Sequence, residues 1–296
     1  MTENNTQNNI IEEQLSHEVT IFAEPIFNIG TFQVTNSLLT SWLAVLIILA
    51  ITLAIKLKLK KIPGKFQNIF EVILEGALSL CDQVTNNRKL SLKIFPFIFS
   101  LFLFILINNW LGLLPILGSM GFVVKEGVHS VFVPFLRSGT ADINTTLALS
   151  IMVVIGSNLF GAVVLGIWKT FNKYVNLNGL GSIFTKVRKD PSVLIVAPIT
   201  FFVGLLELLG EIAKSASLSF RLFGNVFAGE VLLASMSAIF AYIIPGPFLF
   251  LEIFVGLIQA LIFSLLATVY FTMASQDHSE HDEHKEHEKE KLLVSV

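Results

Sequence analysis

The chain has 296 residues, of which 53% are hydrophobic and 14% are charged, and its mean hydropathy is +0.73. Soluble domains carry about 25% charged residues, so this composition excludes a soluble enzyme, a disordered protein and a secreted disulfide scaffold. It predicts a polytopic membrane protein. The net charge of −2 indicates little about partners, because the charges are segregated along the chain, and Cys81, the only cysteine, has no partner for an internal disulfide.

Five apolar stretches are long enough to cross a bilayer, which takes about 20 helical residues. In chain order they are residues 38–55, 94–114, 143–168, 192–239 and 248–274. The last two are expected to form a long hairpin around Pro245-Gly246-Pro247. The predicted fold class is therefore an all-α polytopic membrane protein with five transmembrane helices.

A sixth helical pattern lies between the first two spans. From Phe66 to Leu80, apolar residues recur at steps of three and four, and polar residues such as Gln67, Glu71 and Glu75 fall between them. This spacing predicts an interfacial amphipathic helix on the inner membrane surface. A helix that packs on its neighbours as part of the core is the alternative.

The distribution of basic residues predicts the orientation. Residues 1–55 contain five acids and no Lys or Arg, whereas five lysines lie between residues 56 and 65. Because Lys and Arg collect on the cytoplasmic side, the N-terminus is expected outside and the C-terminus in the cytoplasm. The chain is thus divided into a polar outer segment (1–36), a membrane domain (37–275) and a charged cytoplasmic tail rich in His and Glu (276–296).

The fourth span carries charges that its apolar surroundings make costly, about 2.5–3.5 kcal/mol for each charge at a helix centre. Glu207, Lys214 and Arg221 are seven residues apart and therefore share a face. Glu211 joins that face, so either glutamate could neutralise Lys214. Arg221 has no acid three or four residues away, so its partner must come from another helix or another subunit.

Acids and amides in the last two spans fall at matching depths. Glu230 lies nine residues beyond Arg221, half a turn round and about 13 Å along the axis, so we expect it to line a hydrated crevice open to the outside. In an antiparallel hairpin Glu230 can be level with Glu252, and Arg221 with Gln259. Acids on either side of a fixed cation suit two offset proton paths, because direct passage would meet like-charge repulsion.

One segment of the fourth span resembles a known signature. The residues from Ser217 to Glu230, SLSFRLFGNVFAGE, resemble the motif of subunit a of the F-type ATP synthase. Two further segments, 109–115 and 259–275, resemble the second-span motif and the last helix of that family. The resemblance covers about residues 36–276.

The resemblance implies a stator subunit beside a rotating ring of c subunits. It also implies contacts with subunit b of the peripheral stalk, with other ATP synthase subunits and with the lipid bilayer, in a bacterial-type plasma (inner) membrane. Arg221 would face the essential carboxylate of the ring, with Asn225 and Gln259 as polar neighbours. A mobile carboxylate on the ring could pass Arg221, releasing its proton to one path and taking another from the second.

The resemblance also implies roles for the remaining polar residues. Glu230 would line the outer half-channel, and Glu207, near Lys214 and Ser217, would lie along the inner one. Glu252 stands where bacterial relatives often have His, so we expect an acid pair that titrates jointly in place of a Glu–His relay.

Other polar residues have simpler interpretations. Asp142 and Asn144 are expected to cap the third span, and Asn109 and Asn158 to bond neighbouring helices. Ser215 stands where many relatives have Pro. Because a proline is the usual cause of a kink at that place in the helix, a kink is not predicted for this chain. Histidines repeat every three residues in the tail, where a solvated segment is expected rather than a metal site.

The sequence contains no Gly-rich phosphate-binding loop that ends in Lys-Ser or Lys-Thr. We therefore expect no active site, no cofactor and no nucleic-acid partner for this chain, and we assign ATP chemistry to partner subunits. Two other functions use the same observations. One is a self-contained secondary transporter that works with the buried charges, although such folds often show internal repeats and none is visible here. The other is a structural membrane scaffold.

Overall fold

The structure is a computed structural model that describes residues 22–114, 120–126, 129–167, 193–239 and 245–276. Within these residues, five helices are long and apolar enough to cross a membrane. They are α2 (Asn36–Lys58), α4 (Arg88–Gly112), α6 (Ile143–Leu165), α9 (Val193–Ile239) and α10 (Pro245–Ser275). Together with α3 (Lys65–Thr85), they confirm the predicted all-α class with five spans and one further helix.

Two predicted helix ends are wrong. The third span was expected to reach Trp168, but α6 ends at Leu165, where Gly166 adopts a φ of 99° and its N–H bonds the Ala162 carbonyl. The Pro-Gly-Pro sequence was expected to form the turn of the last hairpin. Instead α10 begins at Pro245, because a helix tolerates proline in its first turn, where N–H groups have no helical acceptor.

Side-chain caps set the first residues of two spans. The Asn87 side chain accepts hydrogen bonds from the N–H groups of Lys89 and Leu90 at the start of α4. The Asp142 carboxylate accepts one from the Asn144 N–H at 3.2 Å and a second from the Ser37 hydroxyl of α2 at 3.2 Å. The capping role predicted for Asp142 is therefore confirmed, and the same side chain ties α6 to α2. Asn144 itself lies inside α6.

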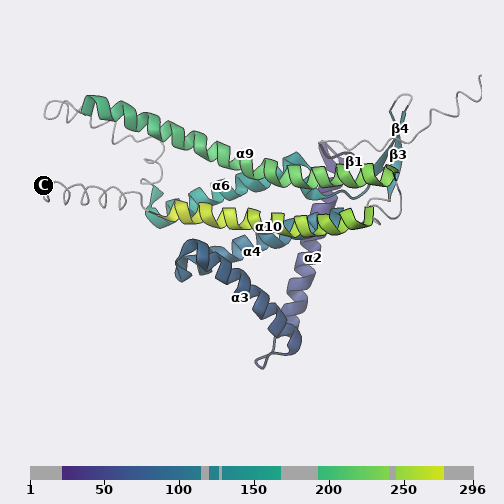
Figure 1. Ribbon diagram of the computed structural model, residues 1–296, viewed down its shortest axis with the longest axis horizontal. Coiled ribbons are helices and arrows are strands. Elements are labelled where there is room, and N and C mark those ends of the chain that lie inside the picture. The colour runs from purple at the N-terminus through teal and green to yellow at the C-terminus, as the bar shows by residue number, and fades with distance from the viewer. Residues whose placement is uncertain (1–21, 115–119, 127–128, 168–192, 240–244, 277–296) are drawn as a thin grey trace, which may run out of the picture.

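The last helix, α10, is the centre of the bundle. It packs against α4, α6, α9 and α3, and Figure 1 shows it between α9 and α4. Its buried face carries Ala260, Phe263 and Ala267. Gly161 of α6 permits a close approach of the two backbones, because a Cβ there would lie 2.4 Å from the Ala274 carbonyl oxygen. The hydrophobic core is therefore built around α10, with contributions from Ile105, Val153 and Leu222.

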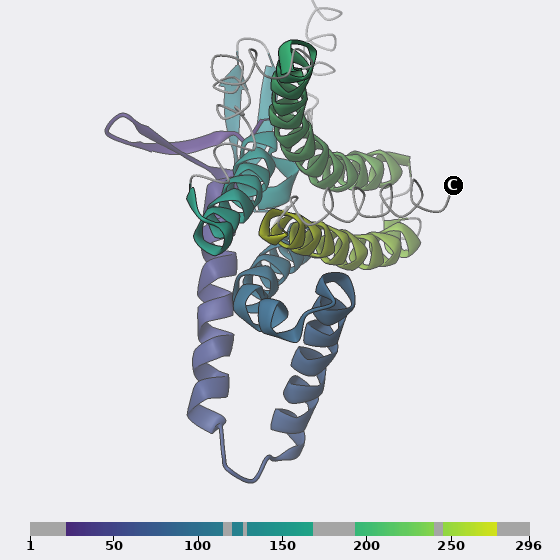
Figure 2. The same cartoon turned by 90° about the vertical axis from the view of Figure 1, so that its left-hand side faces the viewer.

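The α2 and α3 helices form two arms that extend away from this bundle and are joined by residues 59–64 (Figure 2). In the first half of α3, Ile69, Val72 and Ile73 are more than half exposed. Near its end, Cys81 is buried, with its Sγ 3.9 Å from the Thr268 hydroxyl of α10. The end of α3 therefore packs on the core, as the alternative interpretation predicted, whereas its first half presents an open apolar face. Its place on the inner membrane surface stays a prediction.

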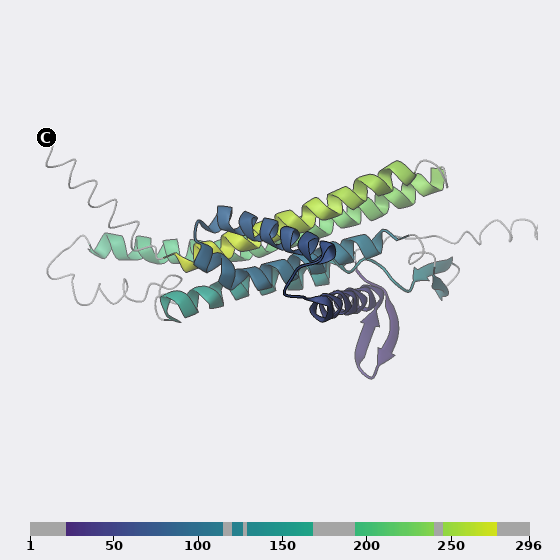
Figure 3. The same ribbon diagram turned by 90° about the horizontal axis from the view of Figure 1, so that it is seen from below.

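Two short antiparallel hairpins were missed by the sequence analysis. The first joins β1 (Pro25–Ile29) to β2 (Phe32–Thr35), with Gly30 at a φ of 66° in its turn. The second joins β3 (Gly121–Glu126) to β4 (His129–Pro134). Figure 3 shows both hairpins outside the helical bundle. Part of the predicted polar segment 1–36 is thus a hairpin, while residues 1–21 and the His-rich tail from 277 lie outside the described residues.

The length of α9 limits how it can sit in a bilayer. Its 47 residues span about 70 Å at 1.5 Å per residue, more than twice the hydrocarbon thickness of about 30 Å. The 23-residue α2 crosses the direction of α9 and α10 steeply (Figures 1 and 3). If the axis of α2 is perpendicular to the bilayer, α9 and α10 are strongly tilted. Polar groups that are far apart along a tilted α9 differ less in bilayer depth than they would in a perpendicular helix.

Candidate functional site

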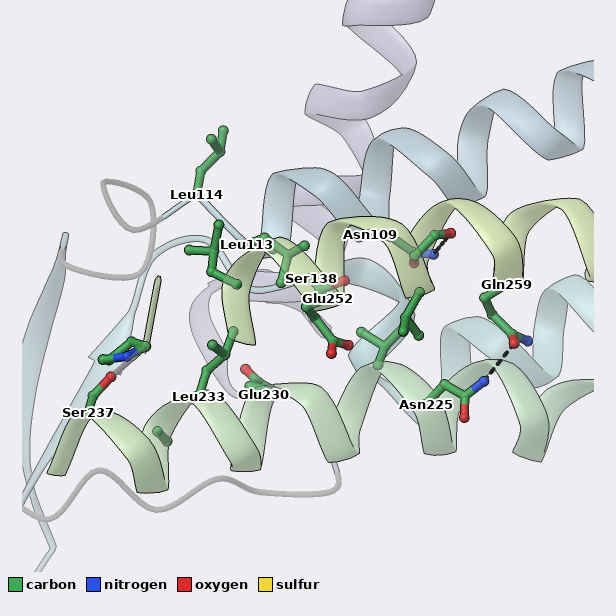
Figure 4. A pocket seen from close by; sticks show the side chains of 17 residues that line it. Asn109, Leu113, Leu114, Ser138, Asn225, Glu230, Leu233, Ser237, Glu252 and Gln259 are labelled. Carbon is green, nitrogen blue, oxygen red and sulfur yellow. Dashed lines mark hydrogen bonds between the residues drawn. The ribbon is translucent and has the colours of Figure 1, made fainter. Parts of the chain in front are cut away.

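A cavity of about 380 Å³ opens between one end of α9, the facing turns of α10 and the end of α4. Figure 4 shows polar side chains from all three directions pointing into it. Water occupies about 30 Å³ per molecule, so the cavity can hold a chain of several waters. The polar residues that line it are Asn109, Ser138, Asn225, Glu230, Ser237, Glu252 and Gln259.

Glu252 lies against the backbone of α9 and is only 9% exposed. Its carboxylate occupies the space that a side chain at Gly229 would fill, because an ideal Cβ on Gly229 would lie 1.9 Å from Glu252 Oε1. Figure 4 shows the side chain pointing from α10 toward α9. Glu252 was predicted to lie at the same depth in the hairpin as Glu230. Its contact with Gly229, the residue before Glu230, agrees with this prediction to within one residue. Glu252 has no hydrogen bond or ion pair within the described part of the chain.

Glu230 is held by an arginine that the sequence analysis did not select. Arg137 Nε donates to both carboxylate oxygens, at 2.9 Å to Oε1 and 3.1 Å to Oε2, and Nη2 donates to Oε2 at 2.8 Å. Arg137 is 7% exposed and also donates to the Phe22 carbonyl at 3.3 Å. The two acids of the cavity are therefore unequal, since one of them is clamped by a cation.

The segment that follows Arg137 is fixed to two helices. The Ser138 hydroxyl donates to the Asn108 carbonyl at 3.2 Å, and the Thr140 hydroxyl donates to Asn109 Oδ1 at 2.6 Å. Asn109 in turn donates to the Gly256 carbonyl of α10 at 3.1 Å. The helix-bonding role predicted for Asn109 is confirmed, and it fixes the position of Arg137 relative to α10.

The other end of the cavity is closed by two amides. Asn225 Nδ2 donates to Gln259 Oε1 at 2.6 Å, as drawn in Figure 4. Gln259 is 2% exposed, and its Nε2 has no partner within the described residues. Gln259 was expected to be level with Arg221, but the residue that it contacts on α9 is Asn225, one helical turn farther along.

Arg221 lies on the outer surface of the helix pair. It is exposed, whereas the adjacent Leu222 is fully buried. Ser217 and Asn225, four residues to either side, are also exposed and therefore share its face. Within the described residues Arg221 forms no hydrogen bond and no ion pair, as the sequence predicted from the absence of a nearby acid.

A second charged cluster lies farther toward the start of α9. Lys214 Nζ donates to Glu211 Oε1 at 2.8 Å, and Asn158 of α6 donates to Glu211 Oε2 at 3.3 Å. Of the two partners predicted for Lys214, the structure thus selects Glu211, and Asn158 bonds a neighbouring helix as predicted. The chain passes Ser215 without a break in α9, and the Ser215 hydroxyl lies 3.1 Å from that of Ser150.

Glu207 lies two turns before Lys214 on the same helix and is half-buried. Neither Glu207, Lys214 nor Ser217 lines the cavity. The structure therefore separates the predicted site residues into a cavity group, an exposed group around Arg221 and a charged cluster that precedes Arg221 by two or more turns of α9. The described residues contain no group of three or more His, Cys, Asp or Glu that could hold a metal.

These features define a polytopic helical membrane protein with an acid-lined cavity on one side of a long helix and an exposed cation on another. The family model described as ATP synthase A chain matches residues 38–272, which is most of the chain. That match and the whole-length similarities described below show that the chain belongs to the ATP synthase subunit a family and is a component of the ATP synthase complex.

The similarities extend over nearly the whole length of named relatives. The ATP synthase subunit a of Mycobacterium ulcerans (strain Agy99) is 34% identical over 256 residues, covering 82% of this chain and 89% of the relative. That of Syntrophobacter fumaroxidans (strain DSM 10017 / MPOB) is 30% identical over 267 residues, covering 90% and 95%. With five apolar helices, this membership makes the chain a multi-pass integral membrane protein.

Proposed function

We propose that the chain is the proton-translocating stator subunit of an F-type ATP synthase. In this proposal it provides two offset half-channels to the carboxylate of a rotating c-ring, and Arg221 separates them. Subunit b of the peripheral stalk and other synthase subunits hold it in place, and ATP chemistry occurs on those partners. The membrane is a bacterial-type plasma (inner) membrane, with segment 1–36 outside and the tail 276–296 in the cytoplasm.

The exposed position of Arg221 carries the proposal. A guanidinium remains charged at any physiological pH, and a charge facing lipid at the centre of a span costs about 2.5–3.5 kcal/mol. Because no described residue of this chain neutralises Arg221, an acid on another protein must cover it. A carboxylate on a neighbouring membrane ring fits that requirement in charge.

The cavity supports an outer half-channel. It extends from Glu230 to Asn225 and Gln259, so it approaches the exposed face of α9 one turn from Arg221. The Glu211–Lys214 cluster, with Glu207 beyond it, lies on the other side of Arg221 along the helix. Protons that reach Arg221 from either side would meet a fixed positive charge, which forces them onto the mobile partner carboxylate.

The same exposure argues against a self-contained secondary transporter. Such a protein would enclose its essential charges between its own halves, whereas Arg221 lies on the outer surface. Reconstitution separates the two functions. We expect proteoliposomes with the purified chain alone to conduct no protons and transport no solute, and conduction to appear only with the ring. Transport by the isolated chain would favour the alternative.

The direct test replaces the guanidinium in the assembled complex. Arg221→Ala is expected to abolish ATP-driven proton pumping while the complex still assembles, because the half-channels lose their barrier but no hydrogen bond or ion pair among the described residues is lost. Pumping is measured by quenching of a pH-sensitive dye in inverted membranes. Arg88→Ala is the matched control, since Arg88 is also exposed and pairs with Asp82 away from the cavity. Normal pumping by the Arg221 variant would refute the proposal.

A further inference from the structure

The connection between α2 and α3 is a basic segment without acids. Five lysines lie within ten residues, and all of them are exposed: Lys56, Lys58, Lys60, Lys61 and Lys65. Residues 51–70 contain no Asp or Glu, and none of these lysine side chains forms an ion pair within the described residues. The segment therefore carries a concentrated positive charge that the described part of the chain leaves uncompensated.

The same segment exposes large apolar side chains. Leu57 and Ile62 are each 85% exposed, and both are flanked by lysines. The exposed apolar face continues onto the first half of α3 at Ile69, Val72 and Ile73. Lysines interleaved with apolar side chains are typical of a surface that lies at the boundary between lipid headgroups and acyl chains, because a phospholipid offers a phosphate and a hydrocarbon chain side by side.

A side chain of α3 fixes the shape of the connection. Gln67 Oε1 accepts a hydrogen bond from the Lys60 N–H at 3.1 Å, and Gln67 Nε2 donates to the Lys60 carbonyl at 3.3 Å. The same Nε2 donates to Glu71 Oε1 at 2.8 Å. Glu71 is the first acid after the lysines, and it is bound to this amide rather than to a lysine. The connection is thus held in one conformation with its lysines accessible.

The place of the connection in the fold favours a lipid as the anion. The 23 residues of α2 span about 35 Å at 1.5 Å per residue, close to the hydrocarbon thickness of about 30 Å. As a spanning helix, α2 therefore ends at the depth of the headgroups. Figure 2 shows the connection at the far end of the two arms, away from α9 and α10.

We propose that the α2–α3 connection and the first half of α3 bind anionic phospholipid. The lysines contact the negatively charged headgroups, and the exposed apolar side chains contact the acyl chains. This inference goes beyond the proposed function, involves neither Arg221 nor the cavity, and is the same for either orientation of the chain in the membrane. An acidic surface of a partner protein is the competing occupant, but it would not cover Leu57 and Ile62 with hydrocarbon.

A local probe measures which lipid gathers at the connection. Asn68 is exposed near the start of α3, so Asn68→Cys can carry a fluorophore, while the native Cys81 is buried. The full chain is placed in nanodiscs that contain an equal fraction of either phosphatidylglycerol or phosphatidylcholine with a nitroxide on the acyl chain. The ratio of quenching by the two lipids gives the local enrichment of the anionic one.

We expect phosphatidylglycerol to be enriched at least about tenfold at position 68, because each lysine near an anionic surface contributes about fivefold in affinity. The enrichment should fall when the salt concentration is raised, since salt screens exposed charges. The same fluorophore on Ser235→Cys, an exposed position of α9, should report less than about twofold enrichment. Equal quenching by both lipids at position 68 would overturn the inference.

Charge variants test whether the lysines are responsible. Lys60→Gln/Lys61→Gln should lower the enrichment at least about threefold, whereas Lys60→Arg/Lys61→Arg should keep it within about twofold. The matched control is Lys89→Gln/Lys93→Gln, which removes two exposed lysines at the start of α4 and should also keep it within about twofold. An unchanged enrichment in the first variant, or an equal loss in the control, would reject the assignment to the connection.

The competing occupant gives a different result. If an acidic partner protein covered this face, the isolated chain would show no preference between the two lipids, and quenching by both would decrease at position 68 in the assembled complex. That outcome would also overturn the inference. The measurements need no proton pumping, so a failure of the proposed role of Arg221 and a failure of this lipid site are observed separately.

Discussion

Two arginines of this chain, Arg137 and Arg221, have opposite surroundings. Arg137 is buried and donates hydrogen bonds to Glu230 from two nitrogens. The next residue in the chain, Ser138, donates a hydrogen bond to α4. Arg221 is exposed on α9 and has no ion pair within the described residues. Both lie in or next to membrane-spanning helices, where an unpaired charge is costly.

The difference separates two uses of the same guanidinium. The charge of a buried arginine that forms a bidentate ion pair is neutralised inside the chain, so the arginine acts on the acid that it binds. An exposed arginine without an acid is satisfied only when another protein supplies one, so its effect is on that protein. Stability of the isolated chain should therefore depend on the first, and function of the complex on the second.

The largest expected effect on the isolated chain is that of Arg137→Ala. Removing one partner of a buried ion pair costs about 3–5 kcal/mol, and because Glu230 is partly exposed we expect a loss of about 3 kcal/mol. Arg221→Ala should change the unfolding free energy by less than about 0.5 kcal/mol, because Arg221 is exposed and forms no hydrogen bond or ion pair within the described residues. Thermal unfolding of the detergent-solubilised chain measures both. Equal losses would erase the contrast between the two arginines.

A smaller effect is expected for glycines on packed and open faces. Gly161→Ala should destabilise by about 1–3 kcal/mol through overpacking, since its Cβ would collide with the Ala274 carbonyl. Gly210→Ala in α9 meets nothing within 4 Å and should instead stabilise by about 0.5–1 kcal/mol. Both are measured by thermal unfolding. Tolerance of alanine at position 161 would mean that α6 and α10 are farther apart than described.

A still smaller effect is expected at the start of α6. Asp142→Ala removes the helix cap and should cost about 1 kcal/mol, whereas Asp142→Asn keeps a capping oxygen and should cost only a few tenths. The unfolding midpoint of each variant gives the comparison. If asparagine were as damaging as alanine, the negative charge of Asp142 rather than its hydrogen bonds would be responsible.

The smallest change to the molecule comes from a pair of cysteine probes on α9. Ser217 is exposed on the face of Arg221, whereas Ser219 is fully buried. In the isolated chain, Ser217→Cys should react with a maleimide at least about ten times faster than Ser219→Cys, because reaction needs an accessible thiolate. In the assembled complex the position 217 probe should be protected. Rapid labelling of Ser217→Cys in the complex would show that no partner covers the face of Arg221.

The native cysteine gives the background for that labelling. Burial raises the pKa of the Cys81 thiol, so the thiol stays protonated and slow to react at neutral pH. Its labelling should increase only as the pH rises through this raised value. Measurements at pH 7 therefore report the introduced cysteines, and a fast reaction of the unmodified chain at that pH would show that Cys81 is accessible.

The fold was largely predictable because its signals are local. Long apolar runs predicted all five spans, and the charge pattern around Arg221 predicted that no near neighbour on α9 would neutralise it. The two hairpins were missed, since β1 and β2 fall in a segment judged by its overall polarity. The first residue of α10 was predicted too late in the chain, because Pro245 is equally compatible with a turn and with the first turn of a helix.

The cavity was predictable only in part. Glu230 and Glu252 were placed at one level by hairpin geometry, which depends on residue numbers alone. The Arg137–Glu230 pair joins residues 93 positions apart, a contact created by packing that no local spacing reveals. One signal was available: Arg137 is one of two basic residues in the loop 115–141, and it lies five residues before a helix-capping aspartate.

The absence of a side chain at Gly229 limits which substitutions are tolerated at positions 229 and 252. Because Glu252 Oε1 lies where a Cβ at position 229 would be, the two positions share one side-chain volume. A larger residue at 229 is acceptable only after residue 252 has shortened, as in Gly229→Ala combined with Glu252→Asp. Substitutions at these sites are therefore conditional on each other, and the pair is expected to evolve as a single unit.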